Sequence, residues 1–289
     1  MAGVDVVAGL DVVLRNALMN AYRAHERLGD RGLTLFKKKD EIGGDALLGD
    51  HECERAVIET CRQAVLPIRI VSEEHGLVDL CKHPRMLGVL DGIDGTSVYK
   101  NHCGRGRYGT MFAVYNGVYP TYDDYAACGV MEHASRRLHY AVRGQGMFET
   151  RLDPVGFPTR ICIIHAVSGR KTLAEGARIR FDQPWPYNQK AFAPIVDEFK
   201  TEFVGSSAIN YVDLANGTVD LVLECTRKGN LEIGVAYGMV KEAGGVMVDI
   251  NGDPLGPQKF LSFGQEGHVG VISACSKELA LEALHWVSR

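Results

Sequence analysis

The chain has 289 residues, of which 46% are hydrophobic and 24% charged, and its formal net charge is −4. This balance indicates a folded globular protein with a substantial core, and the mild acidity argues against a nucleic acid polymer as its partner. No uninterrupted apolar run is long enough to cross a bilayer, so we expect no membrane association.

Cysteine usage and the N-terminus indicate a cytoplasmic protein. The eight cysteines are scattered through apolar contexts and none forms a Cys-x-x-Cys pair, so we expect reduced, buried thiols. Asp5 and Asp11 interrupt the apolar character of the first residues, which is not typical of a signal peptide.

The first elements along the chain are predicted to be helices. Residues 4–26 carry apolar side chains at i, i+3 and i+4 spacing, and a second amphipathic pattern covers residues 53–64. Asp50 stands just before this second helix, where a simple N-cap is the alternative to a functional role. Pro67 ends the helix, and residues 68–71 are predicted to form a strand.

The stretch from residue 86 to residue 100 dominates the sequence. Its apolar start predicts a buried strand, which ends in Asp-Gly-Ile-Asp-Gly-Thr, so that Asp91 and Asp94 lie three residues apart at the strand end. Gly95 lets main-chain N–H groups approach a ligand, and a helix starting at about Ser97 would complete an anion site. Cation ligands beside a phosphate cradle predict metal-assisted phosphoryl chemistry, although Asp-Gly pairs are also common in turns.

The next part of the chain is predicted to be a β region. Asn116-Gly117 is flanked by the apolar runs 111–115 and 118–122, which predicts a hairpin. Residues 129–132 and 138–143 are predicted to form a further pair of strands.

Residues 149–200 are rich in proline and are the hardest to interpret. Residues 161–167 form a plausible strand. The aromatic segment 181–192 is interpreted either as a loop that faces a substrate or a partner, or as a packed surface loop. We place a domain boundary near residue 150. It divides the chain into an α+β domain, 1–150, with the metal and phosphate motifs, and an α/β domain, 151–289, that completes the site.

The last third alternates between helices and strands. We expect a helix after Gly205-Ser206-Ser207-Ala208, a longer helix beginning at Glu232 and ending at Gly244-Gly245, strands at 219–225, 246–250 and 269–273, and a final helix at 277–287.

Acidic residues recur at the ends of these elements: Asp50, Glu73, Asp91, Asp94 and Glu232. Oxygen-only ligands suit Mg²⁺ or Mn²⁺ rather than zinc. Two such ions can hold the attacking and leaving oxygens of an in-line displacement. Thr96 would help to orient the attacking water if its hydroxyl bonded Asp50. No recognisable arrangement supplies a serine, cysteine or histidine nucleophile, so we expect no covalent intermediate.

Four motifs resemble those of the inositol monophosphatase-like superfamily, the Mg²⁺-dependent and typically lithium-sensitive phosphatases. Asp-Gly-Ile-Asp-Gly-Thr at 91–96 is similar to the family's Asp-Pro-Ile/Leu-Asp-Gly-Thr/Ser, and Ser-Glu-Glu-His-Gly at 72–76 to its Glu-Glu strand end. Residues 231–236, followed by Glu-Ala-Gly-Gly at 242–245, resemble its C-terminal motif, and residues 205–208 its Gly-Ser-x-Ala element. The similarity covers about residues 40–150 and 200–275.

The resemblance implies an α/β fold, a layered α-β-α-β-α sandwich of the sugar-phosphatase type, often assembled as a homodimer. It implies two or three Mg²⁺ ions per site (Mn²⁺ is possible), held by Glu73, Asp91, the Ile93 carbonyl, Asp94 and Glu232. It also implies that Asp50 and Thr96, together with Glu73, activate the water. The substrate's phosphate and alcohol would be contacted by Gly95, Thr96, Ser97, Gly205, Ser206, Ser207 and Glu224.

Two departures from the family pattern keep alternatives open. Gly92 replaces the motif proline and Leu231-Glu232 replaces Trp-Asp, so a non-catalytic binding or regulatory homologue is the alternative to an enzyme. Within the enzyme interpretation, Glu224 suits an inositol- or sugar-like alcohol. Arg105 and Arg107 would instead suit the second anion of fructose 1,6-bisphosphate or simply form a solvated loop. An aromatic platform at Trp185 or Tyr187 would suit a 3′-phosphonucleotide.

Overall fold

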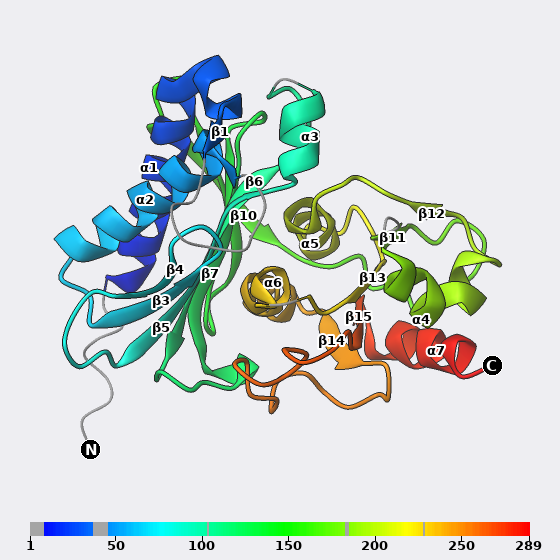
Figure 1. Ribbon diagram of the computed structural model, residues 1–289. Coiled ribbons are helices and arrows are strands. Elements are labelled where there is room, and N and C mark those ends of the chain that lie inside the picture. The colour runs from blue at the N-terminus through cyan, green and yellow to red at the C-terminus, as the bar shows by residue number, and fades with distance from the viewer. Residues whose placement is uncertain (1–8, 37–45, 103, 183–184, 228) are drawn as a thin grey trace.

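The computed structural model describes residues 9–36, 46–102, 104–182, 185–227 and 229–289. Figure 1 shows five layers: α1 and α2, a large sheet, α5 and α6, a small sheet, and α4 with α7. This arrangement is the α-β-α-β-α sandwich expected from the sequence. Each sheet has helices on both faces, so both faces of its inner strands are buried.

The large sheet has eight strands in the order β10-β9-β8-β7-β6-β5-β3-β4. All neighbours are antiparallel except β3 and β5, which run parallel. Every residue of β5 is buried, because α2 contacts one face and α6 the other. The strands are β3 Ile68–Ser72, β4 Gly76–Asp79, β5 Met86–Asp94, β6 Gly109–Asn116, β7 Tyr125–Glu132, β8 Arg137–Val142, β9 Gly146–Leu152 and β10 Pro158–His165.

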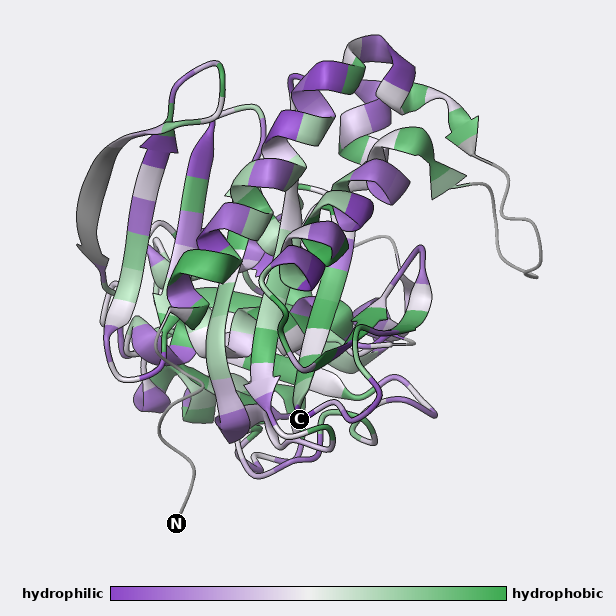
Figure 2. Ribbon diagram, turned by 90° about the vertical axis from the view of Figure 1, so that its left-hand side faces the viewer, coloured by the Kyte–Doolittle hydropathy of each residue, from purple (hydrophilic) through white to green (hydrophobic). Residues whose placement is uncertain are grey.

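The outer helix layer covers one face of this sheet. Helices α1 (Leu10–Leu28) and α2 (Leu48–Gln63) direct buried apolar side chains onto the strands. Figure 2 looks onto this layer and shows hydrophilic residues along the helices. A short 3-10 turn, η1 (Gly29–Leu33), and the two-residue strands β1 (Leu35–Phe36) and β2 (Ala46–Leu47) connect them. Residues 4–8 of the first predicted helix lie outside the described residues.

The small sheet has the order β12-β11-β13-β15-β14. A second core fills the space between the two sheets around α5 and α6. These elements are β11 Ile179–Phe181, β12 Thr201–Glu202, β13 Leu221–Cys225, β14 Val246–Asp249, β15 Gly270–Ala274, α3 Thr96–Asn101, α4 Pro186–Val196, α5 Ser207–Ala215, α6 Leu231–Glu242 and α7 Lys277–Val287.

The structure corrects the predicted hairpin at Asn116-Gly117. Strand β6 ends there, but residues 118–122 form no strand, and β6 pairs with residues 125–132 instead. Thr121 and Asp124 form a reciprocal capping box that starts a 3-10 turn, η2 (Tyr122–Asp124), and this local bonding displaces the hairpin. The predicted pairing of 129–132 with 138–143 is confirmed by β7 and β8.

The segment 181–192 was predicted to be a loop, and this is wrong for its second half. Pro186 is at the start of α4, where the missing N–H of proline costs no hydrogen bond. The interpretation of Asp50 as an N-cap is also wrong. Helix α2 begins at Leu48, so Asp50 lies buried within its first turn.

The structure also bears on the expected domain boundary, on membrane-spanning helices and on the cysteines. The large sheet continues through β9 and β10, past the proposed boundary at residue 150, and the division into two domains stays a prediction. Among the described residues, no helix combines the length and the apolar character needed to cross a bilayer. Cys53, Cys61, Cys128, Cys225 and Cys275 are buried free thiols.

Candidate metal and phosphate site

A cleft of about 650 Å³ opens where the end of β5 meets the first residues of α3, α5 and α6. It brings together most of the residues predicted from the sequence. The predicted residues in its wall are Glu73, Asp91, Ile93, Asp94, Gly95, Thr96, Ser97, Gly205, Ser206, Ser207 and Glu232.

Three carboxylates form the centre of this cleft. Asp91, Asp94 and Glu232 each offer an oxygen, and these oxygens all lie within 4.8 Å of one another. Burial, followed by the charge of Glu73, raises the pKa of Asp91 well above its usual range. Burial and the charge of Glu232 raise the pKa of Asp94 to about 6.

The donor set fits a hard divalent cation. Oδ1 of Asp91 is buried and accepts no hydrogen bond from the described residues, so an acceptor points into the cleft without a partner. Carboxylate oxygens are the ligands that Mg²⁺ prefers, and a cation would relieve the repulsion that raises these pKa values.

Glu73 lies at the edge of the same cluster. The residue as a whole is exposed, but the surrounding protein keeps water away from its carboxyl group. This desolvation, followed by the charge of Glu232, raises the pKa of Glu73 to about 8. Its position is set by Glu54, a fully buried residue of α2 that the sequence analysis missed. Glu54 accepts hydrogen bonds from the main-chain N–H groups of Glu73 and Glu74, both at 3.0 Å, and from the Ser72 hydroxyl.

The expected contact between Thr96 and Asp50 is not formed. The Thr96 hydroxyl donates to the Ile93 carbonyl at 2.9 Å, because the tight turn brings the two groups together. Asp50 is buried and is not among the residues that line the cleft, and burial, followed by the charge of Glu73, raises its pKa.

Gly92 and Gly95 are required by close packing. A Cβ on Gly92 would lie 2.4 Å from the Asp50 carbonyl oxygen, which explains why this chain has glycine at the family's proline position. Gly95 has a φ of +90°, and a Cβ there would lie 2.9 Å from Cβ of Ser206. The first turn of α2 and the start of α5 therefore press against the motif from two sides.

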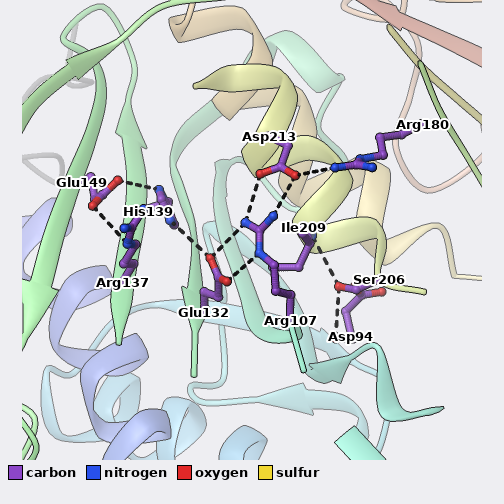
Figure 3. Close-up of polar contacts among 10 residues, drawn as sticks. All are labelled: Asp94, Arg107, Glu132, Arg137, His139, Glu149, Arg180, Ser206, Ile209 and Asp213. Atoms are coloured by element: carbon purple, nitrogen blue, oxygen red, sulfur yellow. Dashed lines mark hydrogen bonds and ion pairs between the residues drawn. The ribbon is translucent and has the colours of Figure 1, made fainter. Parts of the chain in front are cut away.

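The N-terminus of α5 holds Asp94. The Ser206 hydroxyl and the Ala208 main-chain N–H both donate to Asp94 Oδ2, the latter at 2.7 Å. Ser206 is also the N-cap, accepting from Ile209 N–H at 3.3 Å (Figure 3). The helix dipole and both donors stabilise the ionised carboxylate.

Arg227 is a second residue that the sequence analysis missed. Its Nη2 lies 2.6 Å from Glu232 Oε1, 3.3 Å from Glu224 Oε1 and 3.2 Å from Ser207 Oγ. It lies two residues after β13, near the carboxyl end of a strand, as Asp91 and Asp94 lie near the carboxyl end of β5, and this position was the signal available in the sequence. Asp182, also missed, lies in the same wall.

Glu224 is not in the cleft wall. It is 1% exposed and accepts from the Ser207 hydroxyl at 2.8 Å. Burial raises its pKa to about 8. The structure therefore places Ser207 between Glu224 and the cleft.

Arg105 and Arg107 do not reach this cleft and line a separate pocket. The Arg107 guanidinium binds Glu132 and Asp213, with both shortest contacts at 2.8 Å (Figure 3). The Nε, Nη1 and Nη2 groups of Arg107 all donate hydrogen bonds to these two carboxylates, so we do not retain Arg107 as a substrate ligand. Trp185, by contrast, is in the cleft wall.

The comparisons with known proteins agree with this geometry. The model of the Inositol monophosphatase family matches residues 18–285, and the chain belongs to this family of metal-dependent phosphomonoesterases, which use Mg²⁺. An inositol-1-monophosphatase from Aeropyrum pernix is 23% identical over 221 residues, 74% of this chain and 76% of that protein.

Solved structures show the same fold. An IMPase from Thermotoga maritima has a TM-score of 0.73 and 19% identity, with 97% of both chains covered. The extragenic suppressor protein SuhB from Bartonella henselae has a TM-score of 0.75 and 16% identity, with coverage of 97% of this chain and 99% of that one.

Proposed function

We propose that the chain is a Mg²⁺-dependent phosphomonoesterase that hydrolyses a small phosphorylated polyol or sugar, similar to an inositol monophosphate. The observation that carries this proposal is the convergence of Asp91, Asp94 and Glu232 beside the open backbone of Gly95. The substrate class rests on the family and on the Aeropyrum pernix relative.

The chain's own residues have separate roles in this proposal. Glu73, Asp91, Asp94, Glu232 and the Ile93 carbonyl would hold the ions. When bound, Mg²⁺ supplies Lewis acidity and lowers the pKa of a coordinated water.

Main-chain and side-chain groups of residues 95–97 would contact the phosphate, and Gly205, Ser206 and Ser207 would face the alcohol. Glu224 would act through Ser207, whose hydroxyl it fixes. Asp50, Thr96 and Glu73 would position the attacking water. Thr96 would do so as an acceptor, because its own hydrogen is donated to Ile93.

The decisive experiment measures phosphate release from a panel containing inositol monophosphate, fructose 1,6-bisphosphate and a 3′-phosphonucleotide, with and without Mg²⁺. We expect turnover of the polyol phosphate that depends on Mg²⁺ and falls about 100-fold or more in Asp94→Asn. Asp253→Asn, in an exposed turn, is the matched control.

Other outcomes of this experiment would indicate a different function or contradict the proposed metal site. Preference for the bisphosphate or the nucleotide would select one of the alternative substrates. Binding of Mg²⁺ and phosphate esters without any turnover would indicate the non-catalytic homologue. Full activity in Asp94→Asn would contradict the proposed metal site. Homodimer formation, a further prediction, is checked by light scattering of the same preparation.

A further inference from the structure

A second group of ligating side chains lies on β8, β9 and β10, the three strands at one end of the large sheet, away from the cleft. His139 and Glu149 are directly opposite each other in the β8–β9 register, and His165 ends β10. His165 Nε2 lies 3.1 Å from Glu149 Oε2, and His139 Nδ1 lies 3.8 Å from the same oxygen. One ligand atom from each residue falls within 4.8 Å of the other two.

An independent observation concerns His139 itself. The residue is 1% exposed, and neither of its ring nitrogens has a hydrogen-bond partner among the described residues. An unsatisfied buried polar group is destabilising, and native structures contain few of them. Figure 3 shows the His139 ring between Glu149 on one side and Glu132 on the other.

We propose that His139 Nδ1, Glu149 and His165 Nε2 bind a zinc ion. Two imidazoles and one carboxylate are a common zinc donor set, whereas Mg²⁺ prefers oxygen ligands alone. Zinc–ligand bonds of about 2.0–2.2 Å require the three side chains to close in slightly. Glu149 and His165 have side chains that are 13% and 23% exposed, so water has access to a fourth position.

The surroundings support this assignment. Histidine ligands commonly direct their second nitrogen to a carboxylate, and His139 Nε2 lies 3.9 Å from Glu132 Oε2. Arg107 in turn fixes Glu132, with Nε 2.8 Å from Oε1. The other oxygen of Glu149, Oε1, lies 3.6 Å from Arg137, which leaves Oε2 to face the two histidines.

The ion would join three neighbouring strands at the edge of the large sheet. Strand β10 pairs on one side with β9 and is the last strand of that sheet. A metal that links β10 to β8 across β9 would oppose fraying of this edge. This inference does not depend on the proposed phosphatase activity.

The test is a zinc titration followed by calorimetry, on protein stripped with a chelator and then held in excess Mg²⁺. The excess Mg²⁺ is there to compete for the proposed carboxylate site, and the histidine-site variants identify the zinc that is bound at the histidines. We expect about one zinc per chain in the unmodified protein, and binding weakened at least about tenfold in His165→Gln and in Glu149→Gln. Exposed His83, changed to Gln, is the matched control and should bind normally.

Two further readouts keep the test decisive. Co²⁺ in place of zinc should give the absorption of a four-coordinate site, lost in both variants. Zinc should raise the unfolding temperature of the unmodified protein and of His83→Gln only. One folded variant, either His165→Gln or Glu149→Gln, is sufficient to test the site. No zinc binding in excess Mg²⁺, or undiminished binding in a folded variant, would overturn the proposal.

Discussion

The guanidinium of Arg227 lies 2.6 Å from the carboxylate of Glu232, inside the cluster that is proposed to bind Mg²⁺. Glu232 is therefore shared between a fixed cation and the metal position. The same Arg227 also faces Glu224, so the chain brings its own positive charge to the wall of an otherwise acidic cleft.

Replacing Arg227 by Met should separate the two roles of this cation. Glu232 would be released, so we expect Mg²⁺ to bind several-fold more tightly because a competing charge is removed. The variant should also lose about 3 kcal/mol of stability, since Glu224 would be left buried without a cationic partner and with only the Ser207 hydroxyl as donor among the described residues. Calorimetric Mg²⁺ titration and urea unfolding measure the two effects. Arg227→Lys, which keeps the charge, should bind Mg²⁺ nearly as the unmodified protein does; weaker Mg²⁺ binding in Arg227→Met would contradict this account.

Ser206→Ala tests whether the N-cap of α5 also positions Asp94. Ser276 is a matched control, because it caps α7 in the same way, accepting from Leu279 N–H at 3.1 Å. Both alanine variants should lose about 1 kcal/mol of stability. Ser206→Ala alone should also weaken Mg²⁺ binding, by roughly tenfold, because it removes a donor to the metal-binding carboxylate. Equal Mg²⁺ affinity in the two variants would show that Ser206 is only a cap.

Gly92→Pro restores the residue of the family motif and should nevertheless harm this protein. Any Cβ at this position meets the Asp50 carbonyl oxygen at 2.4 Å, so Gly92→Ala should already destabilise the fold by about 1–3 kcal/mol. Thermal unfolding and phosphate release report the effect. Gly267→Ala is the control, because a Cβ there would have no atom of the described residues within 4 Å. A stable, active Gly92→Pro variant would show that α2 shifts freely.

The stability of the protein should depend on Glu132 at acidic pH. Burial alone would raise the pKa of Glu132, but its contacts with His139 and Arg107 outweigh this and lower the pKa to about 2. The folded-state pKa is depressed, so the stabilisation is complete above about pH 4.5 and is lost as the pH falls toward 2. Its size is on the order of 3 kcal/mol.

Urea unfolding between pH 3 and pH 7 measures this contribution. Glu132→Gln should be less stable than the unmodified protein at pH 7, and the difference should shrink as the pH falls through 4 to 3. Glu52→Gln is the comparison. Glu52 lies on α2, and its solvent-exposed contact with Arg55 lowers its pKa, so we expect a smaller loss of stability. A difference that stays constant with pH would exclude the ion pair as its cause.

Local patterns were sufficient for much of the fold. A continuous apolar run predicted β5, whose residues are all buried, and helical spacing of apolar residues predicted α6 and α7. The hairpin at Asn116-Gly117 failed because Thr121 and Asp124 form a capping box, a bond between side chain and main chain that the apolar pattern does not report. The helix α4 was missed because its prolines were interpreted as loop residues.

By itself, the sequence determined the order of the acidic motifs and their places at element ends, since each follows from a few neighbouring residues. Only the tertiary structure decided which charges meet. Arg107 was a candidate for binding a second substrate anion, with a solvated loop as the alternative, and it is instead ion-paired with Asp213, 106 positions away. Arg227 and Glu54 entered the site although no motif contains them. The reason is physical: electrostatic and hydrogen-bond partners are set by distance in space, and distance in space depends on how the two sheets and their helices pack.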